Sequence, residues 1–318
     1  MRPPTLALVR SRPLLGAVAV GLILLTLTGS TLVKGDSTGR VESLTTPKAI
    51  VLGVVEGITE YLPISSTGHL LVTEKVLDVG QHKNDKDPTD TYTVVIQIGA
   101  ILAVLGIFRK RFVLMLEGLV GRSEEGRSLI LSLLLAFVPA VVIAVALQDP
   151  IKERLLKPWP VVVAWVVGGI AILLFVANSS KLRVRIESVG AITPRVALGI
   201  GVAQVLALWP GTSRSLVTIL AALLLGCSLT AAVEFSFLLG FLTLSAATAY
   251  ELLKHGSEMV DAFGIVNPLI GIVVAGIAAF ASVKWMITYL EKHPLTIFAH
   301  YRFAAAVLTG VLLVTKAI

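Results

Sequence analysis

Long apolar blocks separated by short polar links make up most of the chain. A helix needs roughly 20 apolar residues to cross a bilayer, so each block of that length predicts one transmembrane helix. Such blocks lie at residues 14–33 and at about 92–108, 129–147, 159–177, 232–250, 268–286 and 302–316. The pattern therefore predicts an all-α polytopic membrane protein.

Two further apolar blocks are interrupted near their middle. The first runs over 49–62 and resumes at 69–77, and the second runs over 196–209 and resumes at 213–226. Each piece is too short to span the hydrocarbon core, and each interruption contains a proline. We expect two re-entrant helix–loop–helix hairpins, because irregular backbone at membrane depth is tolerated only where protein or a water-filled cavity covers it.

The N-terminal 45 residues stand apart from the rest. Arg2, Arg10 and Arg12 precede the apolar block 14–33, which we interpret as an extra transmembrane helix or an uncleaved signal anchor. The membrane domain then extends over residues 46–318.

Composition and charge support the membrane class. Only 15% of the residues are charged, and the mean hydropathy is +0.88, whereas soluble domains are about a quarter charged. The net charge of +7 falls in links such as 109–128 and 178–195 and forms no stripe suited to nucleic acid. By the positive-inside rule we expect these two links to be cytoplasmic and the acidic link 251–267 to be external. A single cysteine excludes an intramolecular disulfide.

The two interrupted blocks open an internal repeat. Gly53-Val-Val-Glu aligns with Gly201-Val-Ala-Gln, and Pro63-Ile-Ser-Ser aligns with Pro210-Gly-Thr-Ser. Each half, about 46–178 and about 190–318, would hold one re-entrant pair and three spans. Because three is odd, the second half would be inverted, and the two interruptions would meet near the bilayer midplane.

The first interruption carries the candidate catalytic groups. Glu56 and Glu60 lie on one face of a helix, and Ser65, Ser66, Thr67 and His69 follow the proline. Ionisable groups at membrane depth are functional candidates. The glutamates fit as ligands for a hard divalent cation or as a general base. Ser66, His69 or an activated water could attack; the spacing does not choose among them.

The second interruption carries a candidate anion site in Ser213, Arg214 and Ser215. Helices that begin after the two loops direct unpaired N–H groups into the space between them, and Ser65, Ser66 or Thr67 on one side and Thr212 or Ser213 on the other can cap them. An arginine fork binds two phosphate oxygens at once. The alternative is an arginine that snorkels to the interface.

These motifs resemble the undecaprenyl-diphosphate phosphatases associated with bacitracin resistance. The matching stretches are 53–69, 95–102, 206–215 and 234–239. The likeness extends from about residue 46 to the C-terminus, with departures at Thr212 and Leu216. The resemblance puts the family's glutamate pair on Glu56 and Glu60, its serine–histidine motif on 65–69 and its arginine motif on 213–215.

The resemblance implies release of inorganic phosphate from a C55 isoprenoid diphosphate, which regenerates the lipid carrier for peptidoglycan. It also implies dependence on a divalent metal, Mg²⁺ or Ca²⁺, held by Glu56 and Glu60. Phosphate-binding roles fall on Ser65, Thr67, Ser213, Arg214 and Ser215. The expected location is the bacterial cytoplasmic membrane, with the site facing outward, and a homodimer is compatible with it.

A second function remains open at this level. Inverted repeats are typical of secondary transporters, so the chain could instead carry or flip an anionic isoprenoid lipid. The grouping of Ser66, His69 and the glutamates favours catalysis, because transport needs no nucleophile.

Overall fold

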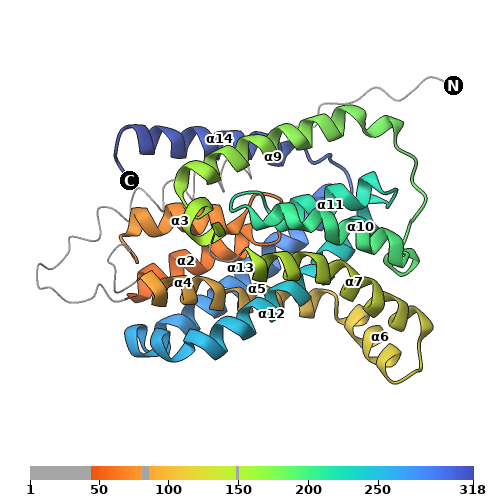
Figure 1. Ribbon diagram of the computed structural model, residues 1–318, viewed down its shortest axis with the longest axis horizontal. Coiled ribbons are helices and arrows are strands. Elements are labelled where there is room, and N and C mark those ends of the chain that lie inside the picture. Colours follow the sequence, from red (N-terminus) through yellow and green to blue (C-terminus); the bar gives the residue numbers. More distant parts are fainter. Residues whose placement is uncertain (1–43, 81–85, 148–149) are drawn as a thin grey trace, which may run out of the picture.

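A computed structural model describes residues 44–80, 86–147 and 150–318 (Figure 1). The predicted N-terminal helix over 14–33 lies outside these residues. The regular elements of the described residues are all helices, and these residues contain no strand, only an isolated bridge between Ile186 and Cys227. The predicted all-α class is confirmed.

The first half begins with two short helices and continues with the first three spans. Its elements are α2 (Thr46–Thr59), α3 (Ser66–Leu77), α4 (Lys86–Val95), α5 (Gln97–Ile107), α6 (Arg109–Leu119), α7 (Glu124–Ala146), the π-helical turn η1 (Ile151–Leu155) and α9 (Pro158–Asn178). The second half likewise begins with two short helices and continues with three spans. Its elements are α10 (Pro194–Gln204), η4 (Val205–Leu208), α11 (Arg214–Leu224), α12 (Leu229–Phe263), α13 (Val266–Leu290) and α14 (Thr296–Val314), preceded by the short turns η2 (Ser179–Lys181) and η3 (Val189–Ala191).

Among the described residues, six helices are long and apolar enough to cross a membrane. They correspond to the six spans predicted after residue 90. One boundary differs: α12 continues to Phe263, so most of the acidic segment expected as a link is helical. No proline interrupts this segment, and the helix ends at Gly264, whose φ of 68° breaks the helical path.

The two interrupted blocks form matching caps. Ser65 and Ser213 have nearly the same backbone angles, φ 74° and ψ 107° against φ 76° and ψ 114°, and each hydroxyl accepts a bond from the N–H three residues on. Aligning these caps also aligns Glu56 with Gln204 and Ser66 with Arg214. The sequence alignment of Pro63 with Pro210 is therefore wrong by one residue, because it matched identical residue types. The structure instead pairs Pro63 with Gly211.

Each short leading helix packs against a span of the other half. Helix α2 lies against α13, and α10 lies against α7. The close approach depends on glycines: a Cβ at Gly57 would overlap the Ala275 carbonyl, and one at Gly201 would overlap the backbone of Ala136. Small residues at such contacts let helix backbones approach in a membrane, where no hydrophobic effect drives association.

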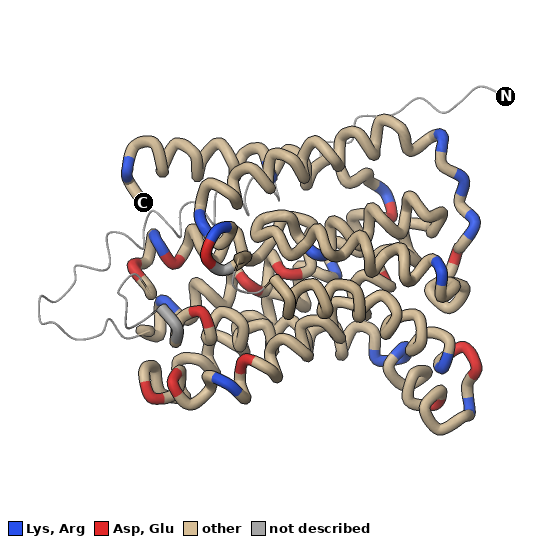
Figure 2. Tube along the Cα trace, in the orientation of Figure 1, with Lys and Arg blue, Asp and Glu red and all other residues tan. Residues whose placement is uncertain are grey.

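The basic residues of the links lie together at one end of the molecule. In Figure 2 the lysines and arginines (blue) of the α6 region and of the link after α9 lie on the right-hand side. The acidic end of α12 (red) lies on the left. This arrangement agrees with the prediction that links 109–128 and 178–195 share one side.

We predict that Gly57→Ala lowers the free energy of unfolding by about 1–3 kcal/mol, the usual cost of overpacking a close contact. The thermal unfolding midpoint in detergent measures the effect. Gly106→Ala is the matched control, because nothing lies within 4 Å of its added Cβ. Equal midpoints for the two variants would contradict the close α2–α13 contact.

Candidate active site

The two loops that follow α2 and η4 meet directly. Ser215 Oγ donates to the Leu62 carbonyl at 3.0 Å, and Ser213 Oγ lies 3.4 Å from the same oxygen. Ser213 and Ser215 are also 3.0 Å apart through their hydroxyls. Both serines were predicted to bind phosphate, but here they join the second loop to the backbone of the first.

Glu60 is the centre of the polar cluster between these loops. Its Oε2 accepts a hydrogen bond from Ser66 Oγ, and its Oε1 accepts one from Arg214 Nη2 at 3.1 Å. All three side chains are largely shielded from solvent. Ser66 and Arg214 are the first residues of α3 and α11, so one carboxylate joins the starts of the two helices.

Several contacts fix the Arg214 side chain. Nη1 donates to the Ser236 carbonyl at 3.1 Å, and the guanidinium carbon lies 5.3 Å from the centre of the Tyr61 ring. Gly240 leaves the space for this fork, because an added Cβ would overlap it. Nε is buried and has no hydrogen-bond partner, which leaves one donor available to a ligand.

Glu56 lies near this cluster and is fully buried. Neither of its carboxylate oxygens has a hydrogen-bond partner, and the Tyr61 hydroxyl is likewise buried and unpartnered. Gln204, the position aligned with Glu56 in the second half, has both side-chain polar atoms buried without a partner. Buried polar groups are normally satisfied, so the two unpartnered oxygens make Glu56 a candidate to bind a ligand.

His69 is held by two bonds. Nδ1 donates to the Ser65 carbonyl at 2.6 Å, and in the neutral ring Nε2 then accepts from the Tyr301 hydroxyl at 2.9 Å. The ring also packs on Trp165 and Tyr301. Both nitrogens are occupied, which makes His69 a poorer candidate for the attacking atom than Ser66.

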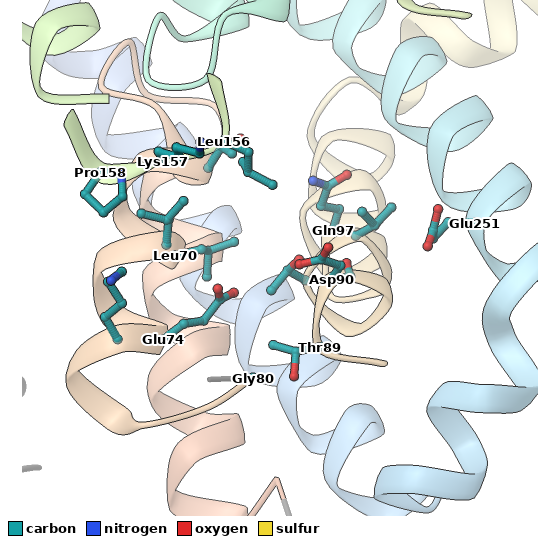
Figure 3. Close-up of a pocket in the computed structure, with 15 residues that line it drawn as sticks. Leu70, Glu74, Gly80, Thr89, Asp90, Gln97, Leu156, Lys157, Pro158 and Glu251 are labelled. Carbon is teal, nitrogen blue, oxygen red and sulfur yellow. The ribbon is translucent and has the colours of Figure 1, made fainter. Parts of the chain in front are cut away.

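Thr67, the remaining predicted phosphate ligand, is exposed and lines a hollow of about 580 Å³ between α3, α4, α5 and α12. Figure 3 shows Leu70 and Glu74 on one side of this hollow and Asp90 and Gln97 on the other. Ser66 precedes Thr67 in the chain, so the hollow runs beside the helix that carries the candidate nucleophile.

Of the two predicted metal ligands, Glu56 and Glu60, only Glu56 has carboxylate oxygens that are not engaged by other side chains. No group of three or more histidine, cysteine, aspartate or glutamate side chains is arranged for a metal within the described part of the chain. Mg²⁺ needs only one or two carboxylates when substrate phosphates complete its shell. Glu56 fits this role because its oxygens are unpartnered, whereas both Glu60 oxygens are engaged.

Sequence reasoning missed three residues that contact these loops. Tyr301 binds His69, Trp165 Nε1 donates to the Ile64 carbonyl at 3.0 Å, and Arg302 is fully buried against both loops. Arg302 was taken as the first residue of a span, where an interfacial charge is ordinary. Arg302 lies six residues inside α14, which begins at Thr296. The apolar residues 297–299 that precede it are the sequence signal that could have placed it within the span.

The arrangement supplies the parts of a phosphoryl-transfer site. A hydroxyl is bonded to a carboxylate that can take its proton, and a guanidinium with a spare donor lies on the other side of that carboxylate.

Comparisons with known proteins agree with this chemistry. The chain is 43% identical over 258 residues to a protein of Rhodospirillum rubrum named undecaprenyl-diphosphatase 2, an alignment covering 81% of this chain and 91% of that protein. It is 42% identical over 261 residues, with the same coverage, to the undecaprenyl-diphosphatase of Burkholderia mallei and to undecaprenyl-diphosphatase 2 of Burkholderia pseudomallei. Residues 49–308 match the family described as bacitracin resistance protein BacA, and the chain belongs to that family.

Proposed function

We propose that this protein is an undecaprenyl-diphosphatase, which converts undecaprenyl diphosphate to undecaprenyl phosphate and inorganic phosphate. The observation that carries the proposal is the double engagement of Glu60 by Ser66 and Arg214. Family membership and the names of the relatives support the same substrate. The reaction recycles the lipid carrier for cell-wall synthesis, and the family description implies bacitracin resistance.

In the proposed mechanism Ser66 attacks the terminal phosphorus. Its proton passes to Glu60 Oε2 as the bond from Oγ to phosphorus forms, and the bond from phosphorus to the bridging oxygen breaks. Undecaprenyl phosphate leaves with that oxygen and takes up the proton from Glu60, which becomes a carboxylate again. Water then attacks the phosphoserine and gives a proton to Glu60. The bond from phosphorus to Oγ breaks, Oγ takes the proton from Glu60, and inorganic phosphate is released.

Arg214 stabilises the charge that develops on the phosphoryl oxygens. Its spare Nε donor and the fork of the guanidinium face a site that is largely shielded from water, where such interactions are strong. The starts of α3 and α11 add unpaired N–H groups on either side. Because Ser213 and Ser215 bond to Leu62, we assign them to loop alignment rather than to phosphate contact.

A divalent cation, Mg²⁺ or Ca²⁺, is the proposed cofactor, with Glu56 as its protein ligand. When bound it would neutralise charge on the diphosphate. Glu60 would join the coordination only by giving up one of its present partners.

We further infer that the protein lies in the bacterial cytoplasmic membrane with its site open to the outer side. The basic links lie together at one end, which the positive-inside rule assigns to the cytoplasm. The hollow beside Thr67 has a small acidic excess, because three carboxylates line it together with two lysines: Glu74, Asp90 and Glu251 with Lys75 and Lys157. The matching caps and the exchange of partners between halves support inverted repeats.

The direct test is phosphate release from undecaprenyl diphosphate by the purified protein in detergent. Release supports the phosphatase. Binding of the lipid without release would overturn it in favour of a transporter or flippase of an anionic isoprenoid lipid.

We expect Ser66→Ala to lower kcat by at least about 10³-fold, and Glu60→Gln by about 10²–10⁴-fold, the usual contribution of a general base. His69→Ala should lose less, because His69 orients Ser65 and Tyr301 and does not attack. Ser179→Ala, which removes an exposed hydroxyl bonded only to a nearby carbonyl, is the control. A larger loss for His69→Ala than for Ser66→Ala would contradict the assignment.

Arg214→Lys should lower kcat by about 10²-fold, because an ammonium cannot replace a planar fork. Gly240→Ala tests the same group indirectly, since its methyl group would displace the guanidinium. We expect a similar loss in both variants. Gly310→Ala, whose Cβ meets nothing within 4 Å, is the control. Normal turnover in Arg214→Lys would restrict Arg214 to a packing role.

Glu56→Gln should shift the divalent-cation titration of activity to at least about tenfold higher concentration, because an amide is a weaker ligand for a hard cation. Glu117→Gln changes an exposed carboxylate on α6 and should leave the titration unchanged. An unaltered titration in Glu56→Gln would remove Glu56 as the metal ligand.

A further inference from the structure

We propose that Arg302 is the positioning residue of this active site, the group that keeps the two loops in register so that Ser66 and Arg214 meet at Glu60. The kinetic part of the inference rests on the proposed phosphatase function. The structural part stands on the contacts of Arg302 alone.

Arg302 is completely buried in α14 and donates to four backbone carbonyls. Nη1 bonds to Pro63 of the first loop at 3.2 Å, and Nη2 bonds to Gly211 of the second loop at 2.9 Å. The other two bonds reach α9, from Nη2 to Ala164 at 2.8 Å and from Nε to Trp165 at 3.2 Å. The guanidinium of Arg302 therefore joins both loops to α9 and α14.

The two loop carbonyls occupy equivalent positions. Aligning the caps Ser65 and Ser213 places Pro63 opposite Gly211, each two residues before its cap. Arg302 thus holds the same point of each loop, and the caps lead directly into Ser66 and Arg214. A shift of either carbonyl relative to the other would move one of these helix starts away from Glu60.

The rest of the structure makes room for this group. Gly168 on α9 faces the guanidinium, and a Cβ there would overlap it. No carboxylate pairs with Arg302 within the described residues. A buried cation without a counter-ion is costly, and a leucine would pack in a helix interface without that cost. What the arginine provides and a leucine would not is the set of N–H donors that bind the loop carbonyls.

Lysine cannot substitute for this geometry. The arginine fork presents five N–H donors in one plane, which reach carbonyls on different sides of it, whereas an ammonium offers three donors at one point. We therefore expect Arg302→Lys to retain the fold but to loosen one or both loops. A misplacement of about 1 Å between reacting groups costs about 10²-fold in rate.

The test compares Arg302→Lys and Gly168→Ala with Gly310→Ala on the same helix as Arg302. The first two should lower kcat on undecaprenyl diphosphate about 10²-fold with KM changed by less than about threefold. Rates are expressed per folded molecule, from thermal unfolding and size-exclusion chromatography. Gly310→Ala should behave as wild type.

A destabilised comparator separates positioning from stability. Gly118→Ala crowds the α6–α7 contact, away from the candidate site, and should lower the unfolding midpoint while keeping kcat per folded molecule. If the loss in Arg302→Lys and Gly168→Ala follows only the folded fraction, as in this comparator, the proposal is wrong.

Hydrogen–deuterium exchange gives a readout that does not need activity. Peptides covering 60–66 and 209–215 should both exchange faster in Arg302→Lys and Gly168→Ala than in wild type, with α12 and α13 unchanged. Unchanged exchange in the loops would overturn the proposal. An inactive wild type with the expected exchange pattern would count against the phosphatase function and leave the loop assignment standing.

Discussion

Buried backbone that is not helical must find hydrogen-bond partners within the protein, because an unpaired buried N–H or C=O group is costly. The first loop meets this requirement with side chains from the rest of the fold. Four consecutive carbonyls, from Leu62 to Ser65, receive donors from Ser213 and Ser215, Arg302, Trp165 and His69 in turn. The groups that satisfy the loop are also the groups that surround the candidate site.

This requirement divides the polar residues of the interior into two sets. One set supports the loops and has its bonding capacity occupied, as His69, Ser213 and Arg302 do. The other set retains free atoms: both oxygens of Glu56, Nε of Arg214 and the Tyr61 hydroxyl are buried without partners. Polar atoms in the second set are the ones that remain available to a ligand.

Sequence reasoning reached the fold class, the six later spans and the two interruptions because apolar length and proline breaks are local signals. It also offered Ser65 and Ser213 among the caps of α3 and α11, as the structure has them. The ligand role that it gave to Ser213 and Ser215 stays a prediction. It did not reveal that both hydroxyls contact a carbonyl of the other loop, because residue type does not show which group a hydroxyl faces. It missed Arg302 because its partners lie far away along the chain.

The equivalence of Ser66 and Arg214 has a consequence for how the site is divided between the halves. Both residues begin a short helix directly after a cap of the same left-handed geometry, so they occupy one structural position in two copies. One copy presents an oxygen that can form a bond, and the other presents nitrogens that can only attract. In the mechanism that we propose, attack and charge neutralisation thus come from a single structural template, specialised by one side chain in each copy.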